Sequence, residues 1–138
     1  MPQLEHVLYT GKTLTTGGRE GASRSTDGRL DIKLSSPGTK GAGTNPEQLL
    51  GAGWSACFIG AISLAAARME IVLPPGVSVE AEIDLGTTDG AYFLGARLNV
   101  SVPGVPPEIA QMLVNEAHRT CPYSKATRGN IDVLIALV

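Results

Sequence analysis

The sequence lacks any concentration of positive charge. Its 138 residues hold 11 Lys and Arg against 13 Asp and Glu, which gives a formal net charge of −2. Because nucleic-acid binding needs a cationic face for the phosphates, we expect no nucleic-acid partner. Residues 1–6 also lack the basic start and the apolar core of a secretory signal, so a cytoplasmic location is expected.

Two further signatures are missing. No group of His, Cys, Asp and Glu has the spacing of metal ligands. The glycine-rich residues 38–43 are not followed by the Lys and Ser or Thr of a phosphate-binding loop. We therefore expect neither a metal nor a nucleotide cofactor.

One uncharged run, residues 49–67, is long enough to cross a membrane. Gly, Ala and Ser dominate it, charged residues flank it at both ends, and no second such run accompanies it. We therefore predict a helix buried in protein, and no membrane partner. Since a helix that is apolar on every side must be covered all round, a domain of this size needs a second subunit to cover it.

The start and the end of this long helix are marked in the sequence. Asn45 is expected to be the N-cap, Pro46 the first helical residue and Gln48 the returning partner of a capping box. The helix is expected to run to about residues 68–70, because the prolines at 74 and 75 prevent its continuation. A second helix is predicted over 106–120, with a short helical segment after Pro122.

Alternation of apolar and polar residues predicts strands over 6–16, 29–34, 77–85 and 91–102, the last two joined as a hairpin. Residues 131–138 are largely apolar, so we predict a closing strand buried on both faces. The order of elements predicts a single α+β domain over residues 1–138 with mostly antiparallel sheets. The larger apolar side chains Trp54, Phe58 and Met112 are expected in the core or in the wall of a pocket.

The only two cysteines have contrasting surroundings. Cys57 lies inside the apolar helix, 11 residues beyond Pro46, where the helix dipole no longer acts and burial raises a thiol pKa. Cys121 precedes Pro122 at a helix start, where thiol pKa values fall, so local physics alone favours Cys121 as the nucleophile. In a reducing compartment a disulfide between them would more often be catalytic or sensing than structural. His118 could polarise Cys121, although a packed or solvent-facing histidine is the commoner case.

Four segments, taken together, are similar to one known family. They are Gly17-Gly18-Arg19-Glu20-Gly21, Gly43-Thr44-Asn45-Pro46-Glu47-Gln48-Leu49, Ala56-Cys57-Phe58 and Ala117-His118-Arg119-Thr120-Cys121-Pro122-Tyr123-Ser124-Lys125-Ala126-Thr127-Arg128-Gly129-Asn130. On these segments the chain resembles the organic hydroperoxide resistance (Ohr) branch of the Ohr/OsmC family. One departure is residues 51–55, Gly-Ala-Gly-Trp-Ser, where the family more often has an Ala-rich sequence with a Tyr.

The resemblance implies both a fold and a set of roles. The fold would be OsmC-like, an intertwined homodimer whose mostly antiparallel sheets wrap a long central helix. Cys57 would be the peroxidatic cysteine and Cys121 the resolving one, while Arg19 and Glu47 would activate the Cys57 thiol. Arg19 would then supply the cation that the surroundings of Cys57 lack, and Glu47 would hold the guanidinium. Without the resemblance, Arg19 would be an exposed loop residue and Glu47 a first-turn acid complementing the helix dipole.

The spacing of Glu47 and Cys57 raises a geometric difficulty. Ten residues on one helix correspond to a rise of about 15 Å, which one guanidinium cannot comfortably bridge. We therefore predict either that Arg19 and Glu47 reach Cys57 from the other subunit of a dimer, or that the helix is broken near residues 51–53.

The function implied is a thiol peroxidase that reduces organic hydroperoxides and is recycled by a dithiol such as dihydrolipoamide or a lipoylated protein. The apolar run around Cys57 predicts a preference for alkyl, aryl or fatty-acid peroxides over hydrogen peroxide. Three alternatives stay open: an OsmC-type stress peroxidase with another substrate range or reductant, a non-enzymatic redox switch or ligand-binding dimer, and a structural disulfide.

Overall fold

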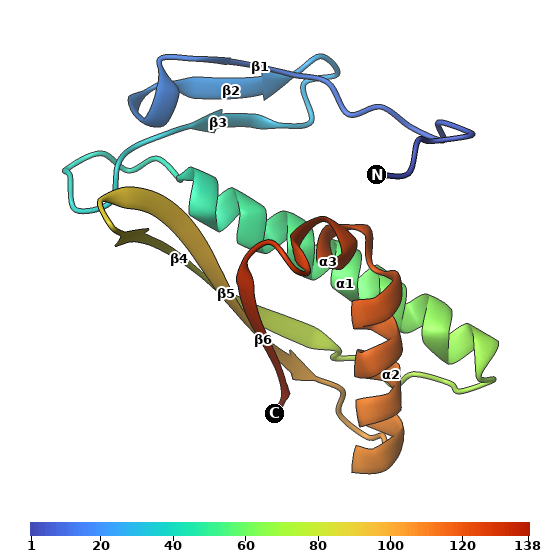
Figure 1. Cartoon of the computed structure of the whole chain (residues 1–138). Coiled ribbons are helices and arrows are strands. Elements are labelled where there is room, and N and C mark those ends of the chain that lie inside the picture. The colour runs from blue at the N-terminus through green and yellow to red at the C-terminus, as the bar shows by residue number, and fades with distance from the viewer. The chain divides into compact units, whose positions relative to one another are not determined.

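The computed structural model describes residues 1–138. The chain divides into two compact units, residues 1–46 and residues 47–138. Each unit has its own three-stranded sheet, with no strand contributed by the other unit. Both sheets and three helices are drawn in Figure 1.

The first unit is a three-stranded antiparallel sheet in the order β1-β2-β3. Its strands are β1 (Thr13–Thr16), β2 (Ala22–Ser25) and β3 (Asp31–Lys33), with the short 3-10 helix η1 (Gly18–Glu20) between the first two. The predicted strand over 6–16 is therefore confined to its last four residues. The sequence of β2 is Ala-Ser-Arg-Ser, which has no β-branched or aromatic residue, so composition did not predict this strand and pairing with its neighbours forms it.

The second unit begins with α1 (Pro46–Arg68), an unbroken helix of 23 residues. Its bounds agree with the predicted helix, and the alternative of a break near residues 51–53 is wrong. One side of α1 is buried within this unit, at Gly51, Trp54, Phe58, Ala61, Ile62, Ala65 and Ala66. Gly51 is close to the neighbouring sheet, because a Cβ there would meet the Ala81 and Ile83 side chains at 3.6 and 3.5 Å.

The sheet of this unit has the order β4-β5-β6. The strands β4 (Ser78–Thr88) and β5 (Ala91–Ser101) form the predicted antiparallel hairpin, whereas β6 (Asp132–Leu137) pairs with β5 in parallel, so the sheet is mixed. The prediction that the last strand is buried on both faces is wrong, because Leu134 is 63% exposed. A run of apolar residues in a strand therefore does not show that both faces of the strand are covered.

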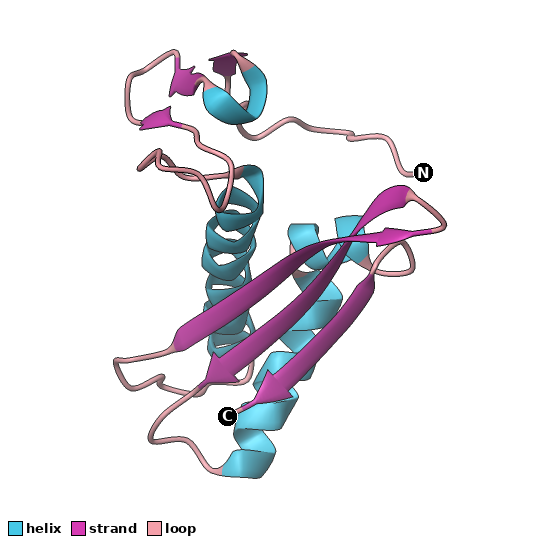
Figure 2. Ribbon diagram, turned by 90° about the vertical axis from the view of Figure 1, so that its left-hand side faces the viewer, coloured by secondary structure: helices cyan, strands magenta, loops and turns pink.

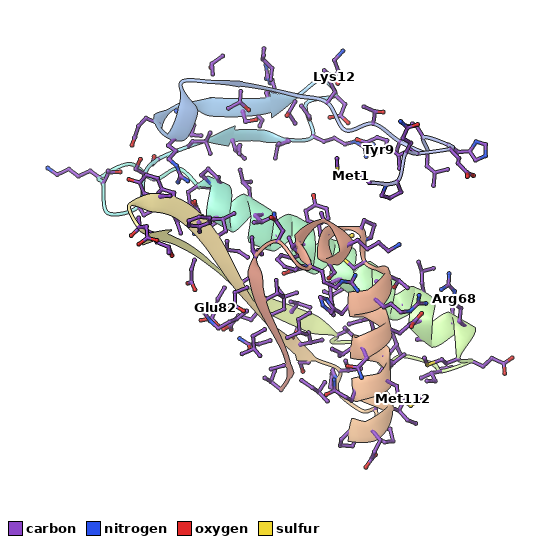
Figure 3. All side chains as sticks on the ribbon, in the orientation of Figure 1. Met1, Tyr9, Lys12, Arg68, Glu82 and Met112 are labelled. Carbon is purple, nitrogen blue, oxygen red and sulfur yellow. The ribbon has the colours of Figure 1, made fainter.

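The helices α2 (Pro107–Thr120) and α3 (Pro122–Thr127) match the predicted C-terminal helices. Figure 2 shows α1 and α2 on the same face of the β4-β5-β6 sheet. The core lies between them and the sheet; its largest fully buried side chains include Trp54, Phe58, Ile62, Leu98 and Leu113. On the opposite face of the sheet, Glu82 and Asp84 bind Arg97 in an exposed network, and Figure 3 shows Glu82 pointing away from the helices.

Two apolar side chains lie outside this core. Met112 on α2 is 54% exposed, so its predicted place in the core or a pocket wall is wrong for this chain (Figure 3). Leu64 is 62% exposed on the side of α1 opposite the core, where Ala52, Ala56 and Gly60 are exposed as well. By length and composition α1 is also apolar enough to cross a membrane, a test that the core helices of soluble proteins pass too.

Candidate active site

The two cysteines meet in the second unit, although 64 positions separate them in the chain. Cys57 lies on α1 and is half-buried, while Cys121 lies at the junction between α2 and α3 and is fully buried. Both are free thiols, and Cys121 lies close enough to Cys57 to raise the pKa of the Cys57 thiol. Two free thiols that lie close together can be oxidised to a disulfide.

The junction that carries Cys121 is held by the main chain. The Cys121 N–H donates to the Ala117 carbonyl at 2.8 Å, and the Cys121 carbonyl accepts from the Lys125 N–H at 2.9 Å. Pro122 then starts α3, where its missing N–H removes no hydrogen bond. The Cys121 N–H thus makes the last backbone hydrogen bond of α2, and Cys121 is also the N-cap residue of α3. Its side chain is buried in the core.

The surroundings of Cys57 within this unit disfavour its thiolate. Burial is the largest cause and raises the pKa of the Cys57 thiol above its ordinary value, and the neighbouring Cys121 raises that pKa further. The backbone N–H of Tyr123 donates to the Cys57 sulfur and lowers the pKa, but burial outweighs it. The expectation from the local sequence, that Cys57 needs a cation delivered from elsewhere, agrees with this balance.

A second pair of side chains joins the same two segments. Trp54 and Ser124 are both fully buried, and the Trp54 indole N–H donates to the Ser124 hydroxyl with an Nε1–Oγ distance of 3.2 Å. The sequence predicted Trp54 only as core or pocket lining and did not identify Ser124. A buried tryptophan N–H needs an acceptor, which is the signal that could have prompted a search for one.

The Tyr123 ring lies against α1 at Gly53. A Cβ built on Gly53 would stand 3.1 Å from the Tyr123 hydroxyl oxygen and 3.4 Å from two carbons of its ring. Gly53 and Cys57 are four residues apart on α1 and so share one face of the helix. Tyr123, which is 41% exposed, therefore covers the helix surface one turn before the half-buried Cys57.

Arg19 and Glu47 belong to different units of the chain. Arg19 lies in η1, which three glycines surround: Gly17 and Gly18 have φ of 73° and 58°, and a Cβ on Gly21 would stand 1.8 Å from the Thr16 carbonyl oxygen. A side chain has no room at Gly21, so this position requires glycine. Glu47 is half-buried at the second position of α1, about 15 Å along the axis from Cys57. Their role in activating Cys57 stays a prediction.

His118 faces a separate cavity of about 340 Å³, lined by Gln111, Val114, Asn115, His118, Val133 and Ile135. Its Nδ1 atom is buried without a hydrogen-bond partner, and burial, with the nearby Arg128, lowers the pKa of the imidazole. His118 is therefore neutral at neutral pH. No three His, Cys, Asp or Glu side chains lie close enough together to hold a metal ion.

Known proteins of similar sequence and fold agree with one another. The OsmC-like protein family matches residues 37–136. An organic hydroperoxide resistance protein of Xanthomonas axonopodis pv. citri is 48% identical over 141 residues, covering 99% of this chain and 99% of that protein. The organic hydroperoxide resistance protein OhrB of Bacillus subtilis is 42% identical over 134 residues, covering 95% of this chain and 98% of that protein.

Solved structures extend this likeness to the fold. The crystal structure of Bacillus subtilis OhrB has a TM-score of 0.90 at 42% identity and covers 96% of this chain and 100% of that chain. A putative organic hydroperoxide resistance protein of Vibrio cholerae, with captopril bound in one of its active sites, has a TM-score of 0.91 at 34% identity, covering 98% of this chain and 95% of that chain. The chain belongs to the OsmC-like family, within its organic hydroperoxide resistance branch. The predicted α+β fold class and the predicted family are thereby confirmed.

Proposed function

We propose that this protein is a thiol peroxidase that reduces organic hydroperoxides to alcohols. The observation that carries the proposal is the meeting of two free thiols with unequal exposure, Cys57 half-buried and Cys121 fully buried. A hydroperoxide can approach the half-buried sulfur first, and the fully buried one then lies ready as its partner. The names of the relatives supply the substrate class, since they are organic hydroperoxide resistance proteins.

The reaction proceeds in three balanced steps. The Cys57 thiolate attacks the terminal oxygen of ROOH, the O–O bond breaks, and the alkoxide leaves as ROH after taking a proton, with Cys57 oxidised to a sulfenic acid. The Cys121 thiol then attacks the sulfenic sulfur and releases water, which forms the Cys57–Cys121 disulfide. An external dithiol such as dihydrolipoamide, free or on a lipoylated protein, reduces this disulfide by exchange and becomes a disulfide itself.

Arg19 and Glu47 have a defined task in this mechanism. Burial raises the pKa of the Cys57 thiol, so formation of the thiolate requires a nearby cation. Arg19 provides it and also stabilises the developing alkoxide, while Glu47 orients the guanidinium. Because α1 is unbroken and separates Glu47 from Cys57 by about 15 Å, we propose that the pair acts on the Cys57 of a partner subunit.

The assembly proposed is a cytoplasmic homodimer in which the two units of each chain belong to one OsmC-type domain. The exposed apolar side of α1, which includes Leu64, supports this assembly because a partner subunit would cover it. The apolar side chains beside Cys57 support a preference for organic hydroperoxides over hydrogen peroxide. Trp54 and Phe58, both fully buried, are the largest of these.

A peroxidase assay tests the proposal. Cumene hydroperoxide and hydrogen peroxide are compared as substrates with dihydrolipoamide as reductant, on the native protein, Cys57→Ser and Cys121→Ser. The native protein is expected to turn over many equivalents of cumene hydroperoxide, and Cys57→Ser none. Consumption of a single equivalent per Cys57 would instead indicate a redox switch. Equal rates with the two peroxides would contradict the substrate preference.

A further inference from the structure

We propose that Trp54 and Ser124 are positioning residues, whose buried hydrogen bond holds α3 on α1 so that Cys121 and the Tyr123 N–H stay against the Cys57 sulfur. The inference rests on the proposed function for its catalytic meaning. The geometry on which it stands lies entirely within residues 47–138.

The Trp54–Ser124 hydrogen bond joins the same two segments of the chain as the contact between the thiols. Trp54 precedes Cys57 by three residues, which is close to one turn of α1. Ser124 follows Cys121 by three residues, which is close to one turn of α3. The same two segments are therefore joined twice, once by the thiols and once by the Trp54–Ser124 bond at 3.2 Å.

Because both partners are buried, the Trp54–Ser124 hydrogen bond favours one arrangement of α3 on α1. Trp54 and Ser124 are both fully buried, so a small shift of α3 that broke the bond would leave the indole N–H and the hydroxyl buried without a partner. A buried polar pair of this kind favours the geometry in which both partners are satisfied over packings of similar apolar area. The bond thus specifies where α3 lies rather than only adding to its attachment.

Gly53 provides the second constraint. Because it has no side chain, the Tyr123 ring can lie on α1 at the distances given above, and the Tyr123 N–H is brought to the Cys57 sulfur. A methyl group at this position would be 3.1 Å from the Tyr123 hydroxyl, closer than most carbon contacts, so the ring would have to shift.

The positions of Tyr123 and Cys121 control two different properties of Cys57. Donation from the Tyr123 N–H favours the thiolate, and the proximity of the Cys121 thiol decides how quickly a disulfide closes once Cys57 is oxidised. Loss of the Trp54–Ser124 bond is therefore expected to slow disulfide closure and to suppress the thiolate together. A residue that only stabilised the fold would change neither property at temperatures well below unfolding.

The experiment measures disulfide closure without any peroxide. Diamide takes two electrons and two protons from the Cys57 and Cys121 thiols, becoming the hydrazine as the disulfide forms. Its rate is followed in the reduced full-length protein and in Trp54→Phe, Ser124→Ala and the double variant, with Ile62→Val as control. Ile62 is also fully buried on α1, but it makes no polar contact with α3.

We expect Trp54→Phe and Ser124→Ala each to slow closure by about tenfold, and the double variant to be no slower than either, because both remove the same bond. In a Cys121→Ser background, both are also expected to shift Cys57 alkylation to higher pH. Ile62→Val should change neither property. Gly53→Ala should act in the same direction as the two polar variants.

Unchanged closure rates and alkylation profiles in Trp54→Phe and Ser124→Ala, with a melting temperature lowered as in Ile62→Val, would overturn the proposal. So would a native protein in which diamide forms no Cys57–Cys121 disulfide. The outcome is independent of the peroxidase assay: a protein that closes its disulfide with diamide yet fails to turn over hydroperoxides would refute the proposed function and leave the positioning role intact.

Discussion

Cys57 and Cys121 present their thiols to one another from different helices, and only Cys57 reaches the solvent. In the proposed mechanism the more exposed Cys57 reacts first, whereas the local sequence favoured Cys121. The helix start at Cys121 favoured that residue as nucleophile, but full burial denies a bulky hydroperoxide access to it. The difference in exposure supports the proposed order of reaction, and the roles of the two cysteines stay predictions.

The first prediction concerns the fate of oxidised Cys57. In Cys121→Ser no thiol remains to condense with the sulfenic acid, so excess hydroperoxide is expected to carry Cys57 on to the sulfinic acid. The variant should reduce about one equivalent of peroxide per chain at a near-native rate and then lose activity within a few turnovers. Mass spectrometry of the peptide containing Cys57 measures this directly. Sustained turnover by Cys121→Ser with dihydrolipoamide would show that Cys121 is not the resolving residue.

The second prediction concerns the exposed side of α1. If a partner subunit covers Leu64, then Leu64→Lys buries a charge in the interface and should weaken dimerisation by at least about tenfold. Sedimentation equilibrium at several protein concentrations measures the effect. Gln111→Lys, at an exposed position on α2, is the control and should leave the assembly unchanged. Identical behaviour of the two variants would exclude this side of α1 as the interface.

The third prediction concerns His118 and pH. Burial and Arg128 lower the pKa of this imidazole in the folded protein, so the unfolded chain binds a proton more readily. The stability that this difference contributes is present above the ordinary histidine pKa of about 6.5 and is lost as the pH falls below it. The melting temperature of the native protein should therefore fall more steeply between pH 7 and 5 than that of His118→Gln. Parallel curves for the two proteins would contradict the inference that His118 is held neutral.

Much of the fold followed from local signals. Asn45-Pro46 and the prolines at 74 and 75 bounded the long helix well, and strict alternation located the β4-β5 hairpin. The strand β2 was missed because Ala22–Ser25 carries no strand preference of its own, and the exposure of Leu134 was missed because composition does not say which face of a strand is covered. Both outcomes depend on tertiary neighbours.

The site divides in the same way. The cysteines could be identified from the sequence, and the family resemblance assigned their roles. The hydrogen bond between Trp54 and Ser124 could not be found, because 70 positions separate its partners and no spacing rule connects them. The contact of Tyr123 with Gly53 could not be predicted from the sequence either, because it depends on Gly53 having no side chain.

The most direct test of the central claim is the pH dependence of Cys57 alkylation by iodoacetamide, measured on the assembled protein in a Cys121→Ser background with and without Arg19→Ala. Burial raises the pKa of the Cys57 thiol, so acidification requires a cation that is not among the present neighbours of Cys57. The account predicts half-maximal alkylation well below the ordinary cysteine pKa of about 8.5, and a shift above it in Arg19→Ala. A profile at or above the ordinary value in the parent protein, unchanged by Arg19→Ala, would contradict it.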